Sequence, residues 1–250
     1  AGNATTAIGD GILGFAGDGG PANKVEMSLP TSVVVDSAGN LYIADTQNQR
    51  VRKVSGSTIS TVAGTGTAGF AGDGAAAGSA QLNGPFGVAV DAAGNLYIAE
   101  FSNNRVRKVG TNGNISTLAG TGVSSYGGDG GQATNAQLNG PQSVAVDAAG
   151  NVYIADTANN RGRKVAPSGV ISTIAGNGTA GFSGDNVAAL SAQVGNPANK
   201  AIPHEMCRTS RDRQGAVGRS RPLPDGRGSL ARGGPDLAAS RTAQCPPSRQ

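Results

Sequence analysis

A unit of about 55 residues occurs three times in this chain, and this repeat constrains the fold more than any other feature. The stretch PTSVVVDSAGNLYIADTQNQRVRKV at 30–54 returns as PFGVAVDAAGNLYIAEFSNNRVRKV at 85–109 and as PQSVAVDAAGNVYIADTANNRGRKV at 141–165. A glycine-rich phrase with an aromatic residue and an Asp precedes each copy and also follows the last one. Repeats of this length predict stacked units, each of which buries its apolar face against its neighbours.

Each unit contains four short segments that are typical of β-strands. In the first unit they are SVVVD at 32–36, NLYIAD at 40–45, RVRKV at 50–54 and ISTVAG at 59–64, and turn residues separate them. Four antiparallel strands in one compact repeat predict the blade of a β-propeller. The sequence therefore predicts an all-β fold with three complete blades, at about 30–64, 85–120 and 141–176.

Three blades are fewer than the roughly four to eight of a closed propeller, so we expect an incomplete propeller with two open blade faces. The remaining part of each repeat, TGTAGFAGDGAAAGSAQLNG in the first, forms a long connection between blades. The segments GSAQL and TNAQL favour a short helical turn within it. Two chains could close a ring through the open faces, which makes self-association a hypothesis of the sequence.

The repeats stop at residue 197, and the chain divides there into two kinds of polypeptide. Residues 1–197 contain every aromatic residue, whereas 198–250 are rich in Arg, Pro and Gly and contain both cysteines and the lone His204. Such a segment is typical of a disordered basic tail. Out-of-frame translation of a GC-rich gene is the alternative that we favour, because the break falls inside a repeat motif.

The repeated pattern P-x-x-V-A-V-D, G-N-L-Y-I-A-D and N-x-R-V-R-K-V resembles the NHL repeat family over residues 8–197. The G-F-x-G-D-G phrase resembles the long connections of bacterial members. The resemblance implies a β-propeller that serves as an interaction platform. Separately from the resemblance, we expect no cofactor and no metal. The resemblance also implies an exported protein, extracellular or periplasmic, although the chain begins without a signal peptide.

The glycine-rich phrase has a structural interpretation. Its aromatic residue is expected to anchor the connection on the blade, and its Asp to accept amide hydrogen bonds inside the turn. The structural turn residues are Asp18, Asp73, Asp129 and Asp185. A Ca²⁺ site is the alternative, but one carboxylate per connection supplies too few of the six to eight oxygen ligands that this ion takes.

A polar turn between the second and third strands of each unit gives a candidate binding rim. Its carboxylate can hold the amides of the turn, and the Arg that follows can pair with the carboxylate; side chains from successive blades would then ring one surface. The candidate rim comprises Asp45, Asn48, Arg50, Glu100, Phe101, Asn103, Arg105, Asp156, Asn159 and Arg161. Glu100 and Phe101 depart from the Asp-Thr of the other units, and such departures are where a specific partner would be recognised.

Three function classes compete, and we expect a non-enzymatic scaffold that binds a protein, with carbohydrate as a further ligand class. An enzyme fragment, a lyase or hydrolase with catalytic residues in absent blades, is the first alternative. It is disfavoured because residues 1–203 contain no His and no Cys, which removes the usual zinc ligands and nucleophile pairs.

Nucleic-acid binding through the repeated Arg/Lys strand is the second alternative. It is disfavoured because residues 1–190 hold 12 acidic against 10 basic side chains and few aromatic residues for base stacking. No apolar run is long enough to span a membrane.

Overall fold

The computed structural model describes residues 3, 5–183 and 185–197. The chain divides into two units, Ala1–Met206 and Cys207–Gln250, and the described strands belong to the first. The expected tail at 198–250 lies outside the described residues, together with His204 and the two cysteines.

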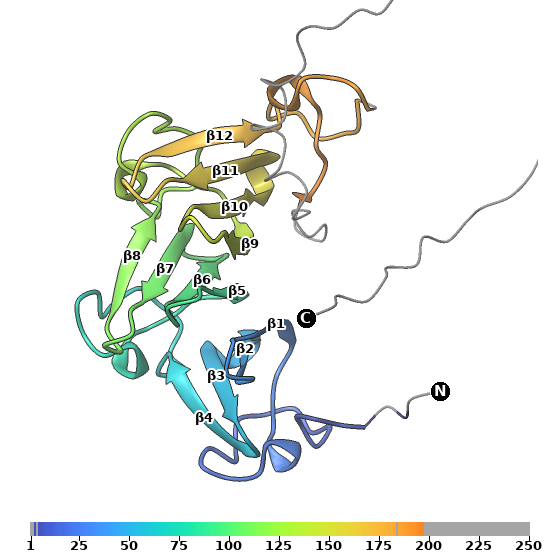
Figure 1. Cartoon of the computed structure of the whole chain (residues 1–250), viewed down its shortest axis with the longest axis vertical. Helices are drawn as coiled ribbons and strands as arrows, with labels where there is room; N and C mark the ends of the chain where they lie inside the picture. The colour runs from blue at the N-terminus through green and yellow to red at the C-terminus, as the bar shows by residue number, and fades with distance from the viewer. Residues whose placement is uncertain (1–2, 4, 184, 198–250) are drawn as a thin grey trace, which may run out of the picture. The chain divides into compact units, whose positions relative to one another are not determined.

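Three separate four-stranded antiparallel sheets make up the described fold, and within each sheet the strands follow one another in sequence order (Figure 1). Blade 1 holds β1 (Pro30–Val35), β2 (Leu41–Asp45), β3 (Arg50–Ser55) and β4 (Thr58–Ala63). Blade 2 holds β5 (Pro85–Val90), β6 (Leu96–Glu100), β7 (Arg105–Val109) and β8 (Ile115–Ala119). Blade 3 holds β9 (Pro141–Val146), β10 (Val152–Asp156), β11 (Arg161–Val165) and β12 (Ile171–Ala175). The all-β fold with three complete propeller blades is thus confirmed.

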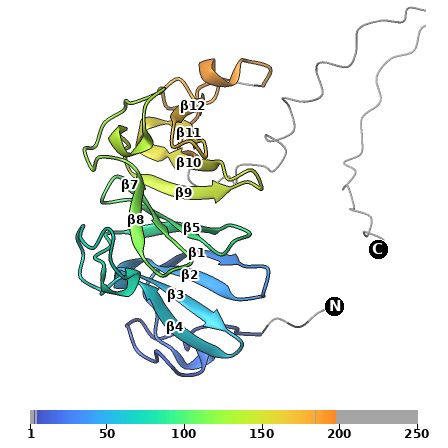
Figure 2. The ribbon, with the colours of Figure 1, turned by 60° about the vertical axis from the view of Figure 1, so that its left-hand side comes forward.

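The blades stack through their first strands, because β5 of blade 2 lies between β1 and β9 (Figure 2). Leu82, from the connection between blades 1 and 2, is fully buried among apolar residues of both blades, including Val51 and Ile98. Leu138 takes the same place between blades 2 and 3. A connection therefore fills the gap between two sheets and completes their shared core.

Among the described residues, six 3₁₀ turns lie outside the sheets. Four of them, η1 (Ala22–Lys24), η3 (Ala77–Ser79), η4 (Ala133–Asn135) and η6 (Ala189–Ser191), lie in the connections, as the sequence predicts for GSAQL and TNAQL. The other two, η2 (Thr46–Asn48) and η5 (Thr157–Asn159), join the second and third strands of blades 1 and 3. The residue after this turn has a left-handed backbone in every blade, with φ of 52° at Gln49 and 51° at Asn104 and Asn160.

Each connection also covers the outer edge of the blade that follows it. In blade 1 the amide of Gly19 donates to the carbonyl of Ile59, and the amide of Ile59 donates to the carbonyl of Gly20. Gly74 and Ala75 bind Ile115 in the same way in blade 2. An exposed edge strand is a template for aggregation, so the glycine-rich phrase protects the last strand of each sheet.

Candidate functional site

The carboxylates of the candidate rim are fully buried rather than exposed. Asp45, Glu100 and Asp156 end the second strand of their blades, and each accepts a hydrogen bond from a backbone amide of the preceding connection. In blade 1 the side chain of Asn48 donates to Asp45 at 2.9 Å and to the carbonyl of Gly14 at 2.6 Å. We expected these carboxylates to hold the amides of their own turn. Each does accept from the Asn side chain of that turn, and each also ties the connection to the blade.

A buried arginine on the third strand pairs with this carboxylate. Arg52, Arg107 and Arg163 are fully buried, and Arg52 lies 3.3 Å from Asp45. The corresponding distances are 3.4 Å from Arg107 to Glu100 and 3.1 Å from Arg163 to Asp156. Each arginine follows a register shift in its strand, and such a bulge changes the direction in which a side chain points.

The Asp of the glycine-rich phrase supplies the second partner of that arginine. Asp18 lies 2.7 Å from Arg52 and Asp129 lies 2.7 Å from Arg163, each pair joining a connection to the next blade. Asp18 also accepts hydrogen bonds from the amide and the hydroxyl of Thr61 on β4. Asp18, Asp73 and Asp129 do lie in turns, but their ion pairs run to the blade, which corrects the expected role of holding their own turn.

The role expected of that Asp belongs to another repeated carboxylate, which directly follows the first strand. Asp36 accepts hydrogen bonds from the amides of Ala38 and Asn40, and from the side chains of Asn40 and Tyr42. The side-chain bond from Asn40 is the main reason why the pKa of Asp36 is lowered. Asp91 and Asp147 have the same environment in blades 2 and 3.

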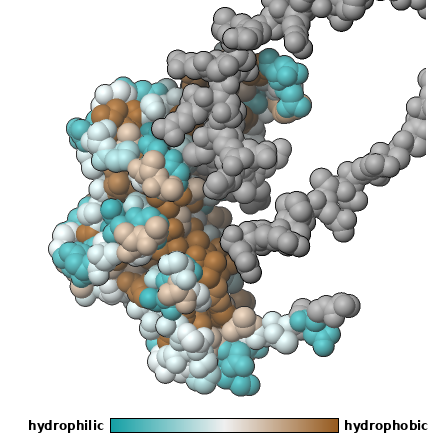
Figure 3. All heavy atoms as spheres, viewed as in Figure 1, coloured by the Kyte–Doolittle hydropathy of each residue, from teal (hydrophilic) through white to brown (hydrophobic). Residues whose placement is uncertain are grey.

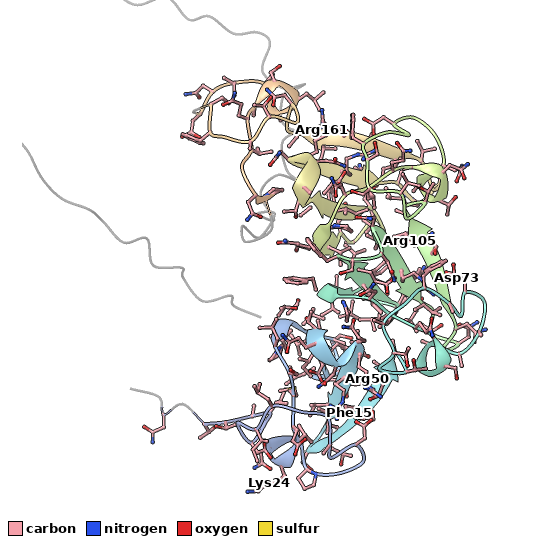
Figure 4. The ribbon with its side chains drawn as sticks, turned by 180° about the vertical axis from the view of Figure 1, so that it is seen from behind. Phe15, Lys24, Arg50, Asp73, Arg105 and Arg161 are labelled. Carbon is pink, nitrogen blue, oxygen red and sulfur yellow. The ribbon has the colours of Figure 1, made fainter. Side chains whose placement is uncertain are left out.

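The first arginine of the RVRK strand stacks on an aromatic residue instead of pairing with a carboxylate. The Arg50 guanidinium lies 3.6 Å from the ring centre of Phe15, and Figure 4 shows the two side by side. Arg105 on Phe70 and Arg161 on Tyr126 repeat this contact at 3.7 Å. The aromatic residues therefore anchor the connections as the sequence predicts, by a cation–π contact.

A glycine makes room for this stacked arginine. Arg50 donates to the carbonyl of Thr65 at 2.6 Å, and a Cβ placed on Gly66 would overlap the Arg50 guanidinium. Gly66 also has φ of 91°, a backbone conformation that residues with a side chain rarely adopt.

Burial is the main influence on the pKa of the Glu100 and Asp156 carboxyls. It raises the pKa of Glu100 to about 7, against the opposing effects of Arg107 and of hydrogen bonds from Asn83 and Asn103. Burial also raises the pKa of Asp156. The pKa of Asp129 is lowered, because hydrogen bonds from Thr173 and Arg163 outweigh its partial burial.

The charged side chains of the predicted rim are thus joined to one another and to the connections, and Phe101 is the rim residue whose large apolar side chain faces solvent. Phe101 is 37% exposed and lies against Phe86, with ring centres 5.7 Å apart and planes tilted by 45°. Sequence reasoning missed Phe86, although its position is Thr31 in blade 1 and Gln142 in blade 3. The aromatic residue at this position in one repeat alone was the sequence signal that could have identified Phe86.

The candidate Ca²⁺ site does not assemble. Asp18 is committed to Arg52 and Thr61, and within residues 3, 5–183 and 185–197 no group of three or more His, Cys, Asp or Glu side chains could hold a metal ion. In the same residues no helix is long and apolar enough to cross a membrane.

Three four-stranded blades, each of which holds the same buried arginine and its carboxylate partners, define a β-propeller repeat protein. The family model described as the NHL repeat matches residues 27–54, and the Teneurin NHL domain matches 60–127 and 121–194. The chain belongs to the NHL repeat family.

Two relatives are similar in sequence to part of this chain. It is 32% identical over 105 residues to Protein SUPPRESSOR OF QUENCHING 1, chloroplastic, of Arabidopsis thaliana, a match that covers 41% of this chain and 10% of that protein. It is 32% identical over 163 residues to mouse Teneurin-1, which covers 57% of this chain and 6% of that protein. The chain therefore spans a tenth or less of the length of these relatives.

Solved structures resemble the fold as well. An auxiliary nutrient binding protein from Bacteroides ovatus matches with a TM-score of 0.48 and 21% identity, over 61% of this chain and 39% of that one. A structure of the nidogen/laminin complex matches with a TM-score of 0.44 and 16% identity, over 61% of this chain and 50% of the matched chain.

Proposed function

We propose that this chain is a non-enzymatic scaffold that binds a protein partner through an aromatic site on the rim, formed by Phe86 and Phe101. The exposed fraction of Phe101 carries the proposal, because a large apolar side chain at this position occurs in one blade of three. Thr46 and Thr157 replace it in blades 1 and 3. An aromatic pair that is partly exposed and held rigidly by the strands is typical of an interface anchor.

The environment of the pair supports this proposal. Strand β5 supplies Phe86, and the turn after β6 supplies Phe101, whose amide donates to the carbonyl of Gly84 at 2.9 Å. A Cβ on Gly140 would lie 2.8 Å from the Phe101 ring, so the ring packs closely on the start of blade 3. The site is therefore preorganised, and a partner would bind it at a low cost in side-chain entropy.

The repeated cations give less support to nucleic-acid binding. Arg52, Arg107 and Arg163 are buried in ion pairs, and the other arginines of these strands stack on aromatic rings. Few of the nine charges of the RVRK strands are left to neutralise phosphates.

We infer the absence of enzymatic activity from the buried carboxylates. Asp45, Glu100 and Asp156 each pair with an arginine of their own blade and accept from a backbone amide of the preceding connection, so no pair of them is free to act on a substrate as acid and base. Assays with lyase and glycosidase substrate panels test this inference, and turnover by the purified chain would contradict it.

A site-specific photo-crosslinker tests the rim. Placed at Phe101, it should form adducts with a discrete protein from the extracellular fraction of the source organism, and the same group at Val123, an exposed residue of a connection, should not. Excess unlabelled chain should suppress the adduct, whereas excess Phe101→Thr chain should fail to do so. Equal adducts at both positions would overturn the proposal, and binding to a glycan array that requires Phe101 would replace protein with carbohydrate.

We also propose an exported location, extracellular or periplasmic, which the resemblance to bacterial NHL proteins supports. Fractionation of the source organism with an antibody against blades 1–3 tests it. Recovery from the culture medium or the periplasm is expected, and recovery with the cytoplasmic proteins would overturn it.

A further inference from the structure

Four Asn-Gly pairs occur in this chain, and the structure places them in different environments. They are Asn83–Gly84, Asn112–Gly113, Asn139–Gly140 and Asn177–Gly178. At such a pair the glycine nitrogen can attack the carbonyl carbon of the asparagine side chain, because glycine has no side chain that blocks the approach. The attack requires a glycine amide that is free to release its proton and to turn toward the asparagine.

Three of the four glycine amides are held by hydrogen bonds. The three bonds are Gly84 amide to Gln49 Oε1 at 2.7 Å, Gly140 amide to Asn104 Oδ1 at 2.8 Å and Gly113 amide to Gly110 carbonyl at 2.9 Å. At these pairs the reaction first has to break a hydrogen bond that the fold provides.

Gly178 is different from the other three glycines. Its amide donates to none of the described residues. Asn177 beside it is exposed, so water can accept the amide proton. The connection that carries the pair has hydrophilic residues on its surface, as the upper right of Figure 3 shows.

This connection, which follows blade 3, is built like the connections that lie between two blades. The amides of Gly176 and Asn177 donate to carbonyls further along the connection at 2.9 Å, and Arg161 donates to the Asn177 carbonyl at 2.8 Å. The same bonds fix the connection between blades 1 and 2. There the amide of Gly66, the counterpart of Gly178, also donates to none of the described residues. The environment of Gly178 is thus that of an ordinary connection.

The side chain of Asn177 is held beside the glycine. Its Oδ1 accepts from the Thr179 amide at 2.8 Å, and its Nδ2 donates to the carbonyl of Ser191 at 3.2 Å. A side chain that bonds to the amide two residues ahead lies beside the peptide group between them, which here contains the Gly178 nitrogen. The Thr179 amide also stabilises the negative charge that develops on Oδ1 during an attack at Cγ.

From these contacts we infer that Asn177 is a modification site, which deamidates without an enzyme. The Gly178 nitrogen gives its proton to water and forms a bond to Cγ of Asn177, and the bond from Cγ to Nδ2 breaks to release ammonia. Water then opens the cyclic imide at either of its two carbonyl carbons. The product is aspartate or isoaspartate, each of which carries one negative charge more than asparagine, and nothing is oxidised or reduced.

The fold accommodates the aspartate product. Asp10 stands at the place of Asn177 in the connection that precedes blade 1, and it also lies between two glycines. Its Oδ1 accepts from the Ile12 amide at 2.9 Å, as that of Asn177 accepts from Thr179. Isoaspartate instead routes the backbone through Cβ and Cγ, so it displaces the carbonyl that Arg161 binds.

Peptide mass spectrometry of the full 250-residue chain tests the inference. The fractions of aspartate and isoaspartate are followed at all four pairs while the folded chain is kept at neutral pH. We expect Asn177 to react at least about fivefold faster than Asn112, which is the factor that one hydrogen bond of typical strength contributes.

Asn112 is the matched control within the same molecule. It is exposed, and its Oδ1 accepts from the amide two residues ahead at 3.1 Å, but its glycine amide is bonded. Equal rates at Asn112 and Asn177 in the folded chain would overturn the proposal. In urea the difference should largely disappear, and a difference that persists there would show that local sequence, and not the fold, selects Asn177.

The variant Asn177→Asp tests whether the product fits the fold. Its urea midpoint should equal that of the wild type, because Asp10 makes the same contact in its own connection. A lower midpoint would contradict the accommodation of aspartate at this position.

Discussion

At the scale of single residues, the stability of this protein depends on buried charge. Each blade holds one arginine inside, between a fully buried carboxylate and a partly exposed one on the connection. A buried ion pair contributes little net stability compared with apolar residues, but removing one partner leaves a charge without compensation. These groups therefore specify where a connection attaches, because only the correct placement neutralises the arginine.

Replacing the arginine of blade 2 should be strongly destabilising. We expect Arg107→Met to lower the free energy of unfolding by about 3–5 kcal/mol, because Glu100 and Asp73 then lose their shared cation. Urea denaturation measures the loss. The control Lys108→Met on the same strand should cost less than about 1 kcal/mol, since Lys108 is partly exposed; equal losses would contradict the argument.

Glu100 should make stability depend on pH near neutrality. Its pKa is about 7 in the folded chain and 4.5 ordinarily, so the folded state binds the extra proton between these values. Stability is therefore greatest below pH 4.5 for this group and falls as the pH rises through 7. The stability of wild type minus that of Glu100→Gln should decrease by about 3 kcal/mol over this range. A flat difference in urea titrations at several pH values would contradict this.

At the scale of elements, the glycine-rich connection has three tasks. It fills the core between two blades with Leu82 or Leu138, it neutralises a buried arginine, and it covers the outer edge of the next sheet. Its aromatic residue and its Asp act together, because both contact arginines of one strand.

Loss of one such carboxylate should loosen an edge strand. In Asp129→Ala the amide of Thr173 loses its acceptor at 3.1 Å, so its hydrogen exchange should become faster, together with that of Ile171. Hydrogen exchange followed by mass spectrometry or NMR measures this effect. Asp185→Ala is the matched control in the last connection and should leave β12 unchanged; faster exchange there would mean that the edge opens for another reason.

At the scale of the whole molecule, blade 2 has a covered face on both sides and blades 1 and 3 have one each. The free energy of unfolding of such a repeat array is the sum of the intrinsic stability of each unit and the interaction free energy of each joint between neighbours. The buried Ile98 of β6 belongs to the core shared with blade 1, and Tyr97 of the same strand belongs to the core shared with blade 3.

Exchange protection should therefore be highest in blade 2. We expect amides of β6 and β7 to exchange more slowly than those of β2 and β3, because opening blade 2 breaks two joints. Native-state hydrogen exchange at low protein concentration measures the order. Equal protection in all three blades would mean that the described blades open as one cooperative unit.

The sequence by itself determined the number of blades, their strands and the aromatic anchors, since repeat length and alternation are local properties of the chain. It also marked Phe101 as a departure from the repeat. Only the tertiary structure decided the partners of the charged side chains, because Asp18 and Arg52 are 34 residues apart in the sequence. The two arginines of one strand also have different environments, since one is buried in ion pairs and the other stacks on an aromatic ring. This difference arises from a bulge in the strand and from the packing of the connection on the blade, which bring together residues that are distant in the sequence. A local sequence pattern does not contain such long-range contacts.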